Sequence, residues 1–231
     1  MVAVSKRRAR PAPEQTAPSE QSAPMPVPLA VAIVAVLVAA AVGSGLSLDW
    51  STHPAAQAGL AACRTQTQLA PGLYAQAPPM CIDPRKNYGG TMVTTKGTIS
   101  FVFLTGSTPK TVNNFIVLAT NGYFNGLKFF NSQSWVIQSG DPQNNGRGGP
   151  GYTLPPEPPR SNDQWVPGSL GMARLPDGSI NGSQFFILRD AWSGGDPSDV
   201  YNHFATITLG FDIASQLDQT DRILQVKVKR T

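Results

Sequence analysis

Few residues beyond position 88 could act as nucleophiles or as metal ligands. This stretch has no cysteine and one histidine, His203, so it lacks the Cys and His ligands that a zinc site needs. A Ser-His-Asp site would have to use the same histidine, and the chain has no G-x-S-x-G turn. The glycine run at 146–151 lacks the Lys-Ser/Thr ending of a phosphate-binding loop. We therefore expect neither covalent nor metal catalysis, no cofactor, and a structural role for His203.

Rotation about an X-Pro peptide bond needs neither a nucleophile nor a metal, because no covalent bond is made or broken. Its barrier of about 18–20 kcal/mol comes from amide resonance. A catalyst needs an apolar slot for the proline ring and hydrogen-bond donors that stabilise the twisted amide better than the planar one. Such a slot requires a rigid scaffold that places apolar and polar side chains next to each other.

The pattern of apolar residues predicts a mainly β domain. Strand patterns, either alternating or continuously apolar, occur at 98–103, 135–138, 184–188 and 224–228. Thr108 and Pro109 predict the start of a helix whose apolar face continues to Ala119 and which ends at Gly122. A short second helix fits residues 211–217. Short strands between Gly and Pro turns, together with two helices, predict a closed barrel capped by helices.

The first 88 residues differ in composition from the rest. Residues 27–48 carry no charge and are long enough to cross a bilayer as one helix. The basic cluster Lys6–Arg10 precedes them, so residues 1–26 are expected to form a disordered cytoplasmic tail. Residues 49–88, rich in Pro, Ala and Gln, are expected to be an extracytoplasmic linker. The chain is thus expected to be a single-pass cell-membrane protein with its domain outside.

A cleaved signal peptide is the competing interpretation of the N-terminal region. Its basic part would be unusually long, and no clear A-x-A cleavage site follows the apolar run. A retained transmembrane anchor at 27–48 is therefore the expectation.

Cys63 and Cys81 are the only cysteines of the chain. Both follow the apolar segment, so they would lie in an oxidising compartment, where an even pair most often forms a disulfide. Two unrelated thiols are the alternative.

Charge is spread unevenly along the chain. Of the formal +4, residues 1–26 carry +2 and residues 27–88 carry +1, which leaves +1 for 89–231. That last stretch has 11 basic against 10 acidic residues and no basic stripe, so nucleic acid is not an expected partner. We expect one monomeric domain over 89–231, which is long enough for a single core.

Several stretches resemble the cyclophilin-type peptidyl-prolyl isomerases. The most specific is NGSQFFIL at 181–188, and the others are TMVTTKGTI at 91–99, TPKTVNNFIVLATNGYFNGLKF at 108–129, GGPGY at 148–152 and SLGMA at 169–173. The likeness runs in order through residues 89–229, and the GGPGY loop is that of bacterial members. It implies a closed eight-stranded antiparallel barrel with two capping helices, preceded here by the transmembrane helix. It also implies a groove that binds proline-containing polypeptides.

The resemblance further implies a set of substrate-binding residues along that groove. The family motif F-H-R-x-x-P-G-F-x-x-Q-G-G-D corresponds to residues 129–141 of this chain. By this and the neighbouring motifs, the residues expected to bind substrate are Phe129, Trp135, Val136, Gln138, Ala173, Gln184, Phe186, Trp192 and Tyr201. Phe186 would form the floor of the proline pocket, and Tyr201 would stand where the family has a histidine.

The catalytic arginine of the family is missing from this motif. Its place falls on Asn131, or on Phe130 if the one-residue deletion is placed differently, while Arg174 stands where the family has asparagine. Losing a preorganised donor typically lowers the rate by about 10²–10³. The expected function is an isomerase that assists the folding of extracytoplasmic proteins, slower than its relatives or using Arg174 as a relocated charge. The alternative is a non-catalytic proline-peptide binding or chaperone module.

Overall fold

The computed structural model describes residues 60–64, 68–158, 160, 164–192 and 201–231. The predicted tail at 1–26 and the predicted anchor at 27–48 lie outside the described residues, as do residues 49–59 of the predicted linker. Within the described ranges, no helix is long and apolar enough to cross a membrane.

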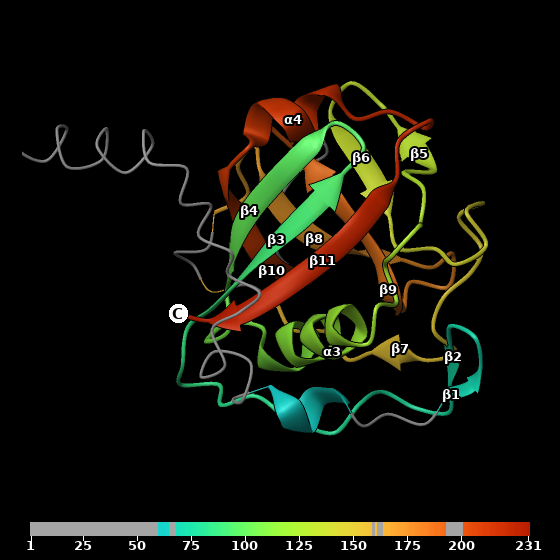
Figure 1. Cartoon of the computed structure of the whole chain (residues 1–231), viewed down its shortest axis with the longest axis vertical. Coiled ribbons are helices and arrows are strands. Elements are labelled where there is room, and N and C mark those ends of the chain that lie inside the picture. The colour runs from blue at the N-terminus through green and yellow to red at the C-terminus, as the bar shows by residue number, and fades with distance from the viewer. Residues whose placement is uncertain (1–59, 65–67, 159, 161–163, 193–200) are drawn as a thin grey trace, which may run out of the picture. The chain divides into compact units, whose positions relative to one another are not determined.

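Nine strands form one antiparallel sheet that curves around the core (Figure 1). The order along the sheet is β11-β3-β4-β10-β8-β9-β6-β5, and β7 pairs with β9. The strands are β3 (Tyr88–Thr94), β4 (Gly97–Phe103), β5 (Asn131–Ser132), β6 (Val136–Ser139), β7 (Thr153–Leu154), β8 (Ser169–Arg174), β9 (Ile180–Leu188), β10 (His203–Leu209) and β11 (Ile223–Arg230).

The prediction of a closed eight-stranded barrel is wrong. The sheet is a half-barrel, because the strands at the two ends of its path, β11 and β5, do not pair with each other. β5 has only two residues, too few to continue the ladder. The chain just before it makes an isolated bridge from Lys128 to Arg222 and a hydrogen bond from Gly126 N to Ile223 O (2.7 Å). A segment without regular strand pairing therefore lies beside β11, where a paired strand would be needed to close the barrel.

Strand β9 is shared between two apolar clusters. All nine of its residues are buried. Phe185 and Ile187 belong to the main core, whereas Phe186 and Leu188 belong to a second, smaller cluster. Because successive side chains of a strand point to opposite faces, β9 separates the two clusters and supports both.

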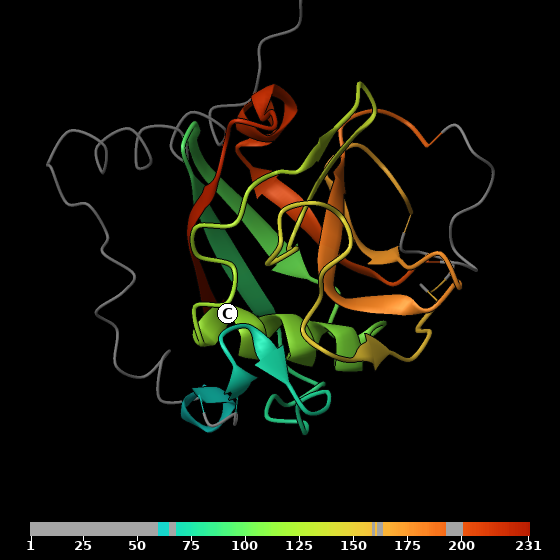
Figure 2. The ribbon, with the colours of Figure 1, turned by 90° about the vertical axis from the view of Figure 1, so that its right-hand side faces the viewer.

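The helices α3 and α4 of the described residues lie at opposite ends of the sheet, as Figures 1 and 2 show. α3 spans Pro109–Thr120 and α4 spans Phe211–Gln216, close to the predicted ranges. Phe115 of α3 is fully buried at the centre of the main core. The rings whose centroids lie within 4.6–6.1 Å of the Phe115 ring belong to Phe101, Phe103, Phe124, Phe185 and Phe204.

The first turn of α3 is capped from a distant loop. Thr108 precedes the helix as predicted, but its hydroxyl donates to the carbonyl of His203 (3.1 Å) and makes no cap. The carboxylate of Glu157 accepts hydrogen bonds from Lys110 N (3.0 Å) and Thr111 N (2.8 Å) instead. An anion at this end satisfies free N–H groups and interacts favourably with the helix dipole.

Residues 60–64 and 68–88 pack against the domain, whereas an extended linker was expected there. The 3-10 helix η2 (Ala61–Arg64) and the hairpin of β1 (Gln68–Ala70) and β2 (Leu73–Tyr74) lie beside α3 and β7 (Figure 1). Tyr74 is 2% exposed, and its N–H donates to the carbonyl of Pro150 (2.8 Å). This N-terminal strap is therefore part of the folded domain.

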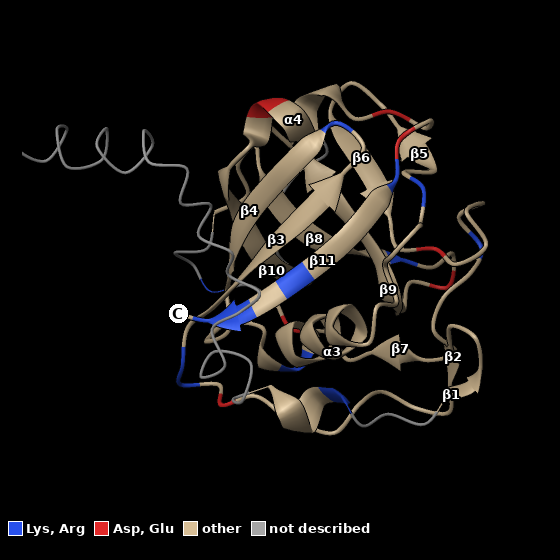
Figure 3. Cartoon of the chain, in the orientation of Figure 1, with Lys and Arg blue, Asp and Glu red and all other residues tan. Residues whose placement is uncertain are grey.

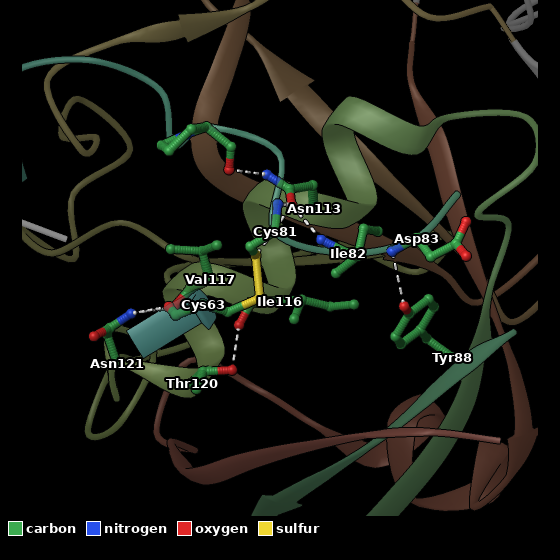
Figure 4. The surroundings of a disulfide bond; sticks show 11 residues. Cys63, Cys81, Ile82, Asp83, Tyr88, Asn113, Ile116, Val117, Thr120 and Asn121 are labelled. Carbon is green, nitrogen blue, oxygen red and sulfur yellow. Dashed lines mark hydrogen bonds between the residues drawn. A yellow bond between two sulfur atoms is a disulfide. The ribbon is translucent and has the colours of Figure 1, made fainter. Parts of the chain in front are cut away.

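A disulfide closes the N-terminal strap into a loop, and hydrogen bonds to Asn113 of α3 and to Asn121 at the end of that helix hold the strap in place. Cys63 and Cys81 are bonded, with an S–S distance of 2.07 Å and a Cα–Cα distance of 5.4 Å. As Figure 4 shows, Asn113 Oδ1 accepts from Cys81 N (2.8 Å), and Asn121 Nδ2 donates to the Cys63 carbonyl (2.9 Å). Closing a loop of this length contributes about 3 kcal/mol to the free energy of unfolding.

Charged residues are scattered along the described part of the chain (Figure 3). The C-terminal half of β11 carries the densest basic group, which consists of Lys227, Lys229 and Arg230. The described ion pairs join Arg85 to Asp83 and Lys96 to Asp218 and Asp221.

Candidate active site

A pocket of about 150 Å³ lies where β5, β6, β8 and β9 meet. The residues that line it are Asn131, Gln133, Trp135, Val136, Gln138, Ala173, Arg174, Phe186, Trp192 and Tyr201. All of these except Gln133 were predicted from the sequence as catalytic or substrate-binding residues. A volume of this size suits a single small ring rather than a large ligand. A larger hollow of about 570 Å³, bordered by β3, β4, β11 and the end of α3, contains none of the predicted residues.

Apolar side chains form the floor of the pocket. Phe186 is 5% exposed and packs with Val136 and Leu188 in the cluster that is separate from the main core. The rings whose centroids lie within 5.3–6.3 Å of the Phe186 ring belong to Trp165, Trp192 and Tyr201. Aromatic rings give a proline ring a large apolar contact area at a low cost in side-chain entropy.

Trp165 supports the floor and was missed by sequence reasoning. Its ring stacks on Phe186 at 5.6 Å and on His203 at 4.3 Å. His203 is itself buried in this stack, at 1% exposure. The signal that could have identified Trp165 is its setting, because a large aromatic residue in a polar, proline-rich loop usually packs against something.

Amide side chains form a polar wall of the pocket. The strand register places Asn131 opposite Gln138, and Gln138 opposite Phe186. Asn131 Nδ2 donates to Gln138 Oε1 (3.3 Å), and Gln138 Nε2 donates to Gln184 Oε1 (3.1 Å). Gln184 is 3% exposed and lies behind the lining, so it influences the pocket through Gln138.

The loop after β6 anchors the inner end of this wall. Gln184 Nε2 donates to the carbonyl of Gly148 (2.7 Å). The buried carboxylate of Asp141 holds the loop by accepting hydrogen bonds from three backbone N–H groups, those of Gln143, Asn145 and Gly146, at 2.6–2.9 Å. Gly140 starts the loop at φ +90°, and a Cβ there would collide with the carbonyl of Ser183, so this position requires glycine.

The structure separates the two candidate positions for the missing arginine. Asn131 lines the pocket, whereas the ring of Phe130 lies beside Gly146, outside the lining. Among the described residues that line the pocket, Arg174 alone is charged. Its side chain is exposed, and Nε donates to the carbonyl of Gly178 in the adjoining turn (2.8 Å). Its guanidinium is thereby held against that turn.

A second arginine, Arg189, supports the pocket from outside its lining. Its Nη1 donates to Ser132 Oγ (3.1 Å) and to the Gln133 carbonyl (3.0 Å), and its Nη2 donates to the Leu217 carbonyl. Partial burial lowers the pKa of Arg189 from its ordinary value. The side chain remains a cation at neutral pH, because an arginine titrates far above it.

Phe129 lies away from the pocket, although the sequence predicts it as a substrate-binding residue. It is 0% exposed and belongs to the main core. Its side chain is therefore part of the main core and does not line the pocket.

Comparison with known proteins gives consistent matches. Residues 91–231 match the family model described as cyclophilin type peptidyl-prolyl cis-trans isomerase/CLD. A peptidyl-prolyl cis-trans isomerase of Synechococcus elongatus is 34% identical over 138 residues, which cover 58% of this chain and 92% of the relative. Peptidyl-prolyl cis-trans isomerase B of Bacillus subtilis is 33% identical over 132 residues, which cover 57% and 90%.

A solved structure is also similar in fold. A cyclophilin-type peptidyl-prolyl cis-trans isomerase of Cryptosporidium parvum aligns with a TM-score of 0.56 at 25% identity, covering 63% of this chain and 99% of that one. The same protein in the presence of the dipeptide Ala-Pro aligns with a TM-score of 0.55 at 26% identity. The family match extends over more than half of the chain and includes every residue of the pocket. The chain therefore belongs to the cyclophilin-type peptidyl-prolyl cis-trans isomerase family and is an enzyme of that family.

Proposed function

We propose that this isomerase acts on X-Pro bonds of polypeptides outside a membrane, assists their folding, and uses a neutral polar wall where relatives use an arginine. The pocket carries the proposal, because it combines an aromatic floor at Phe186 with amide groups at Asn131 and Gln138. The floor would hold the proline ring. The amides would supply the donors for the prolyl amide.

The chemistry follows from the electronic structure of the amide. Twisting the X-Pro bond ends the resonance and localises the lone pair on the prolyl nitrogen. A donor facing that nitrogen therefore stabilises the twisted state more than the planar one, which is the condition for catalysis. A neutral amide is a weaker donor than a guanidinium group, so we expect slower turnover than in arginine-bearing relatives, by up to about 10²–10³.

A proline-containing polypeptide is the substrate that the family match supports. The similar Cryptosporidium parvum isomerase was solved in the presence of Ala-Pro. In this chain Ala173 and Phe186 line the pocket on β8 and β9, and a short extended peptide could lie along them.

Two observations support a location outside a membrane. Residues 27–48 are uncharged and follow the basic cluster Lys6–Arg10, which favours an outward orientation of everything that follows. The disulfide between Cys63 and Cys81 is the type of bond that persists in oxidising compartments and is rare in the cytosol.

A non-catalytic binding or chaperone module is the second candidate. It is favoured by the position of Arg174, whose Nε bonds to the Gly178 carbonyl, and by the neutral residue at 131. In that case the aromatic floor would bind proline peptides without accelerating their isomerisation.

Two-dimensional exchange spectroscopy of an Ala-Pro peptide separates the two candidates. The full chain should raise the exchange rate in proportion to its concentration, and Asn131→Arg should raise it further, by about 10². Peptide binding without any rise in exchange would establish the binding module instead. Protease added to intact cells should digest the domain, and complete protection of the domain would contradict the proposed location.

A further inference from the structure

Five side-chain hydrogen bonds run head to tail along the polar wall of the pocket. We call the side chains of Trp135, Gln133, Asn131, Gln138 and Gln184 the amide relay. In order along the relay, the bonds are Trp135 Nε1 to Gln133 Oε1 (2.9 Å), Gln133 Nε2 to Asn131 Oδ1 (3.3 Å), Asn131 Nδ2 to Gln138 Oε1 (3.3 Å), Gln138 Nε2 to Gln184 Oε1 (3.1 Å) and Gln184 Nε2 to Gly148 O (2.7 Å).

The direction of the amide relay is determined at both of its ends. The indole N–H of Trp135 can only donate, so Gln133 must present its oxygen there. The backbone carbonyl of Gly148 can only accept, so Gln184 must present its nitrogen there. Turning any single amide in between would place two oxygens or two NH₂ groups face to face. Both ends therefore enforce the same orientation on Asn131 and Gln138.

This orientation leaves one donor of Asn131 for a ligand. The Asn131 oxygen accepts from Gln133, and one N–H donates to Gln138. The second N–H makes no hydrogen bond within the described part of the chain, and Asn131 is half-buried in the pocket lining. An amide whose oxygen accepts a hydrogen bond is also a stronger donor, because bonds in a chain polarise one another.

We infer that Asn131 is the donor to the prolyl amide and that Gln133 is the residue that positions it. Gln133 fixes the Asn131 oxygen away from the peptide, and the preorganised N–H then needs no rotation in the twisted state. This inference rests on the isomerase function proposed above and assigns its catalytic donor. Trp135 affects Asn131 indirectly, because its indole N–H fixes the orientation of the Gln133 side chain.

The backbone of Gln133 is held independently of its side chain. Its N–H donates to the Val136 carbonyl (2.9 Å), and its carbonyl accepts from Arg189 Nη1 (3.0 Å). Replacing the side chain should therefore leave the turn folded. Ser134, an exposed neighbour in the same turn, offers a matched control site.

The test compares kcat and KM of the full chain on an Ala-Pro peptide for the wild type, Gln133→Leu and Ser134→Ala. Gln133→Leu should lower kcat about tenfold with KM within about twofold, because the lost interaction orients a group that acts in the transition state. Ser134→Ala should match the wild type. In ¹⁵N spectra, the Asn131 side-chain amide signals should shift with peptide in the wild type and lose that response in Gln133→Leu.

A second variant gives a pH signature that a structural role would not produce. Asn131→Asp keeps the size of the side chain but replaces the donor with an acceptor, so activity at pH 7 should fall more than tenfold. It should recover in part as the pH falls toward about 4, where a carboxyl becomes protonated and can donate. The wild type should show no such rise.

Wild-type kcat in Gln133→Leu, with the Asn131 signals still responding to peptide, would overturn the inference. An inactive wild type would instead overturn the proposed function. The ¹⁵N spectra would then still decide the inference, because a donor to the prolyl amide must respond to bound peptide and Gln133→Leu must abolish the response. If the ¹⁵N signals of the Asn131 side-chain amide did not shift when peptide binds, the inference would be refuted.

Discussion

The main core and the pocket cluster use the same residue types for different purposes. Around Phe115 the rings are buried, whereas around Phe186 the rings of Trp165, Trp192 and Tyr201 are half-buried, and those of Trp192 and Tyr201 line the pocket. The two clusters meet at β9, where adjacent residues face opposite ways. Stability and binding should therefore be separable by mutating neighbouring positions of one strand.

The largest expected effect is a loss of stability at Phe185. This side chain is fully buried, and its ring meets those of Phe115 and Phe124 at 5.6 and 5.7 Å. Phe185→Ala should lower the free energy of unfolding by about 3–5 kcal/mol, because it removes apolar contacts and leaves a cavity. Denaturant titration measures this change. Activity per folded molecule should be retained, and a loss of peptide binding in the folded fraction would show that the two clusters are not separable.

The disulfide should affect stability but not the pocket. Cys63 and Cys81 link the two parts of the N-terminal strap to each other, on the side of the main core. The double replacement by Ala should lower the free energy of unfolding by about 3 kcal/mol. Reduced peptide turnover at a temperature where the variant is fully folded would reveal a connection between the strap and the groove.

Arg174 tests whether the pocket depends on charge. Since its Nε bonds to the Gly178 carbonyl, Arg174→Ala should change kcat/KM on an Ala-Pro peptide less than about threefold. Raising the salt concentration should likewise have little effect, because a neutral donor is not screened. A loss of about 10² or more would show that the guanidinium group reaches the prolyl amide in the complex.

The smallest expected effect concerns acid stability at the β11 end of the sheet. Hydrogen bonds from Thr220, and then the partner Lys96, lower the pKa of Asp218 to about 2. A carboxylate with a lowered pKa stabilises the fold above its unfolded value of about 3.9 and loses that contribution as the pH falls through about 2. The melting temperature of the wild type should therefore drop more steeply between pH 4 and pH 2 than that of Asp218→Asn. Equal slopes would contradict this assignment.

The strands could be predicted from local apolar patterns, whereas the pocket residues were expected only from the resemblance to the cyclophilin family. Apolar alternation places residues 98–103 in β4, and NGSQFFIL corresponds to β9. The mainly β, cyclophilin-like fold was predicted correctly. Whether the sheet closes was predicted incorrectly, because closure depends on the pairing of residues far apart in sequence, around Lys128 and Arg222.

The features that were missed depend on tertiary contacts. Tyr74 and Ile82 lie in a segment rich in Pro, Ala and Gln without apolar periodicity, and only packing against the main core buries them. Gln133 is an exposed polar residue in the stretch where the chain departs from the family motif. Its role follows from two partners, Trp135 and Asn131, and no spacing rule predicts such a contact.

The central claim is that a pocket without the family arginine still catalyses isomerisation. The most direct measurement is the exchange rate of an Ala-Pro peptide with the full chain, compared with that of Phe186→Ala, which removes the pocket floor at a residue outside the main core. We predict exchange that rises linearly with wild-type protein and falls about 10–10²-fold in Phe186→Ala, as loss of one buried aromatic contact would give. A wild-type rate equal to that of Phe186→Ala, at protein concentrations where the wild type binds the peptide, would contradict the account.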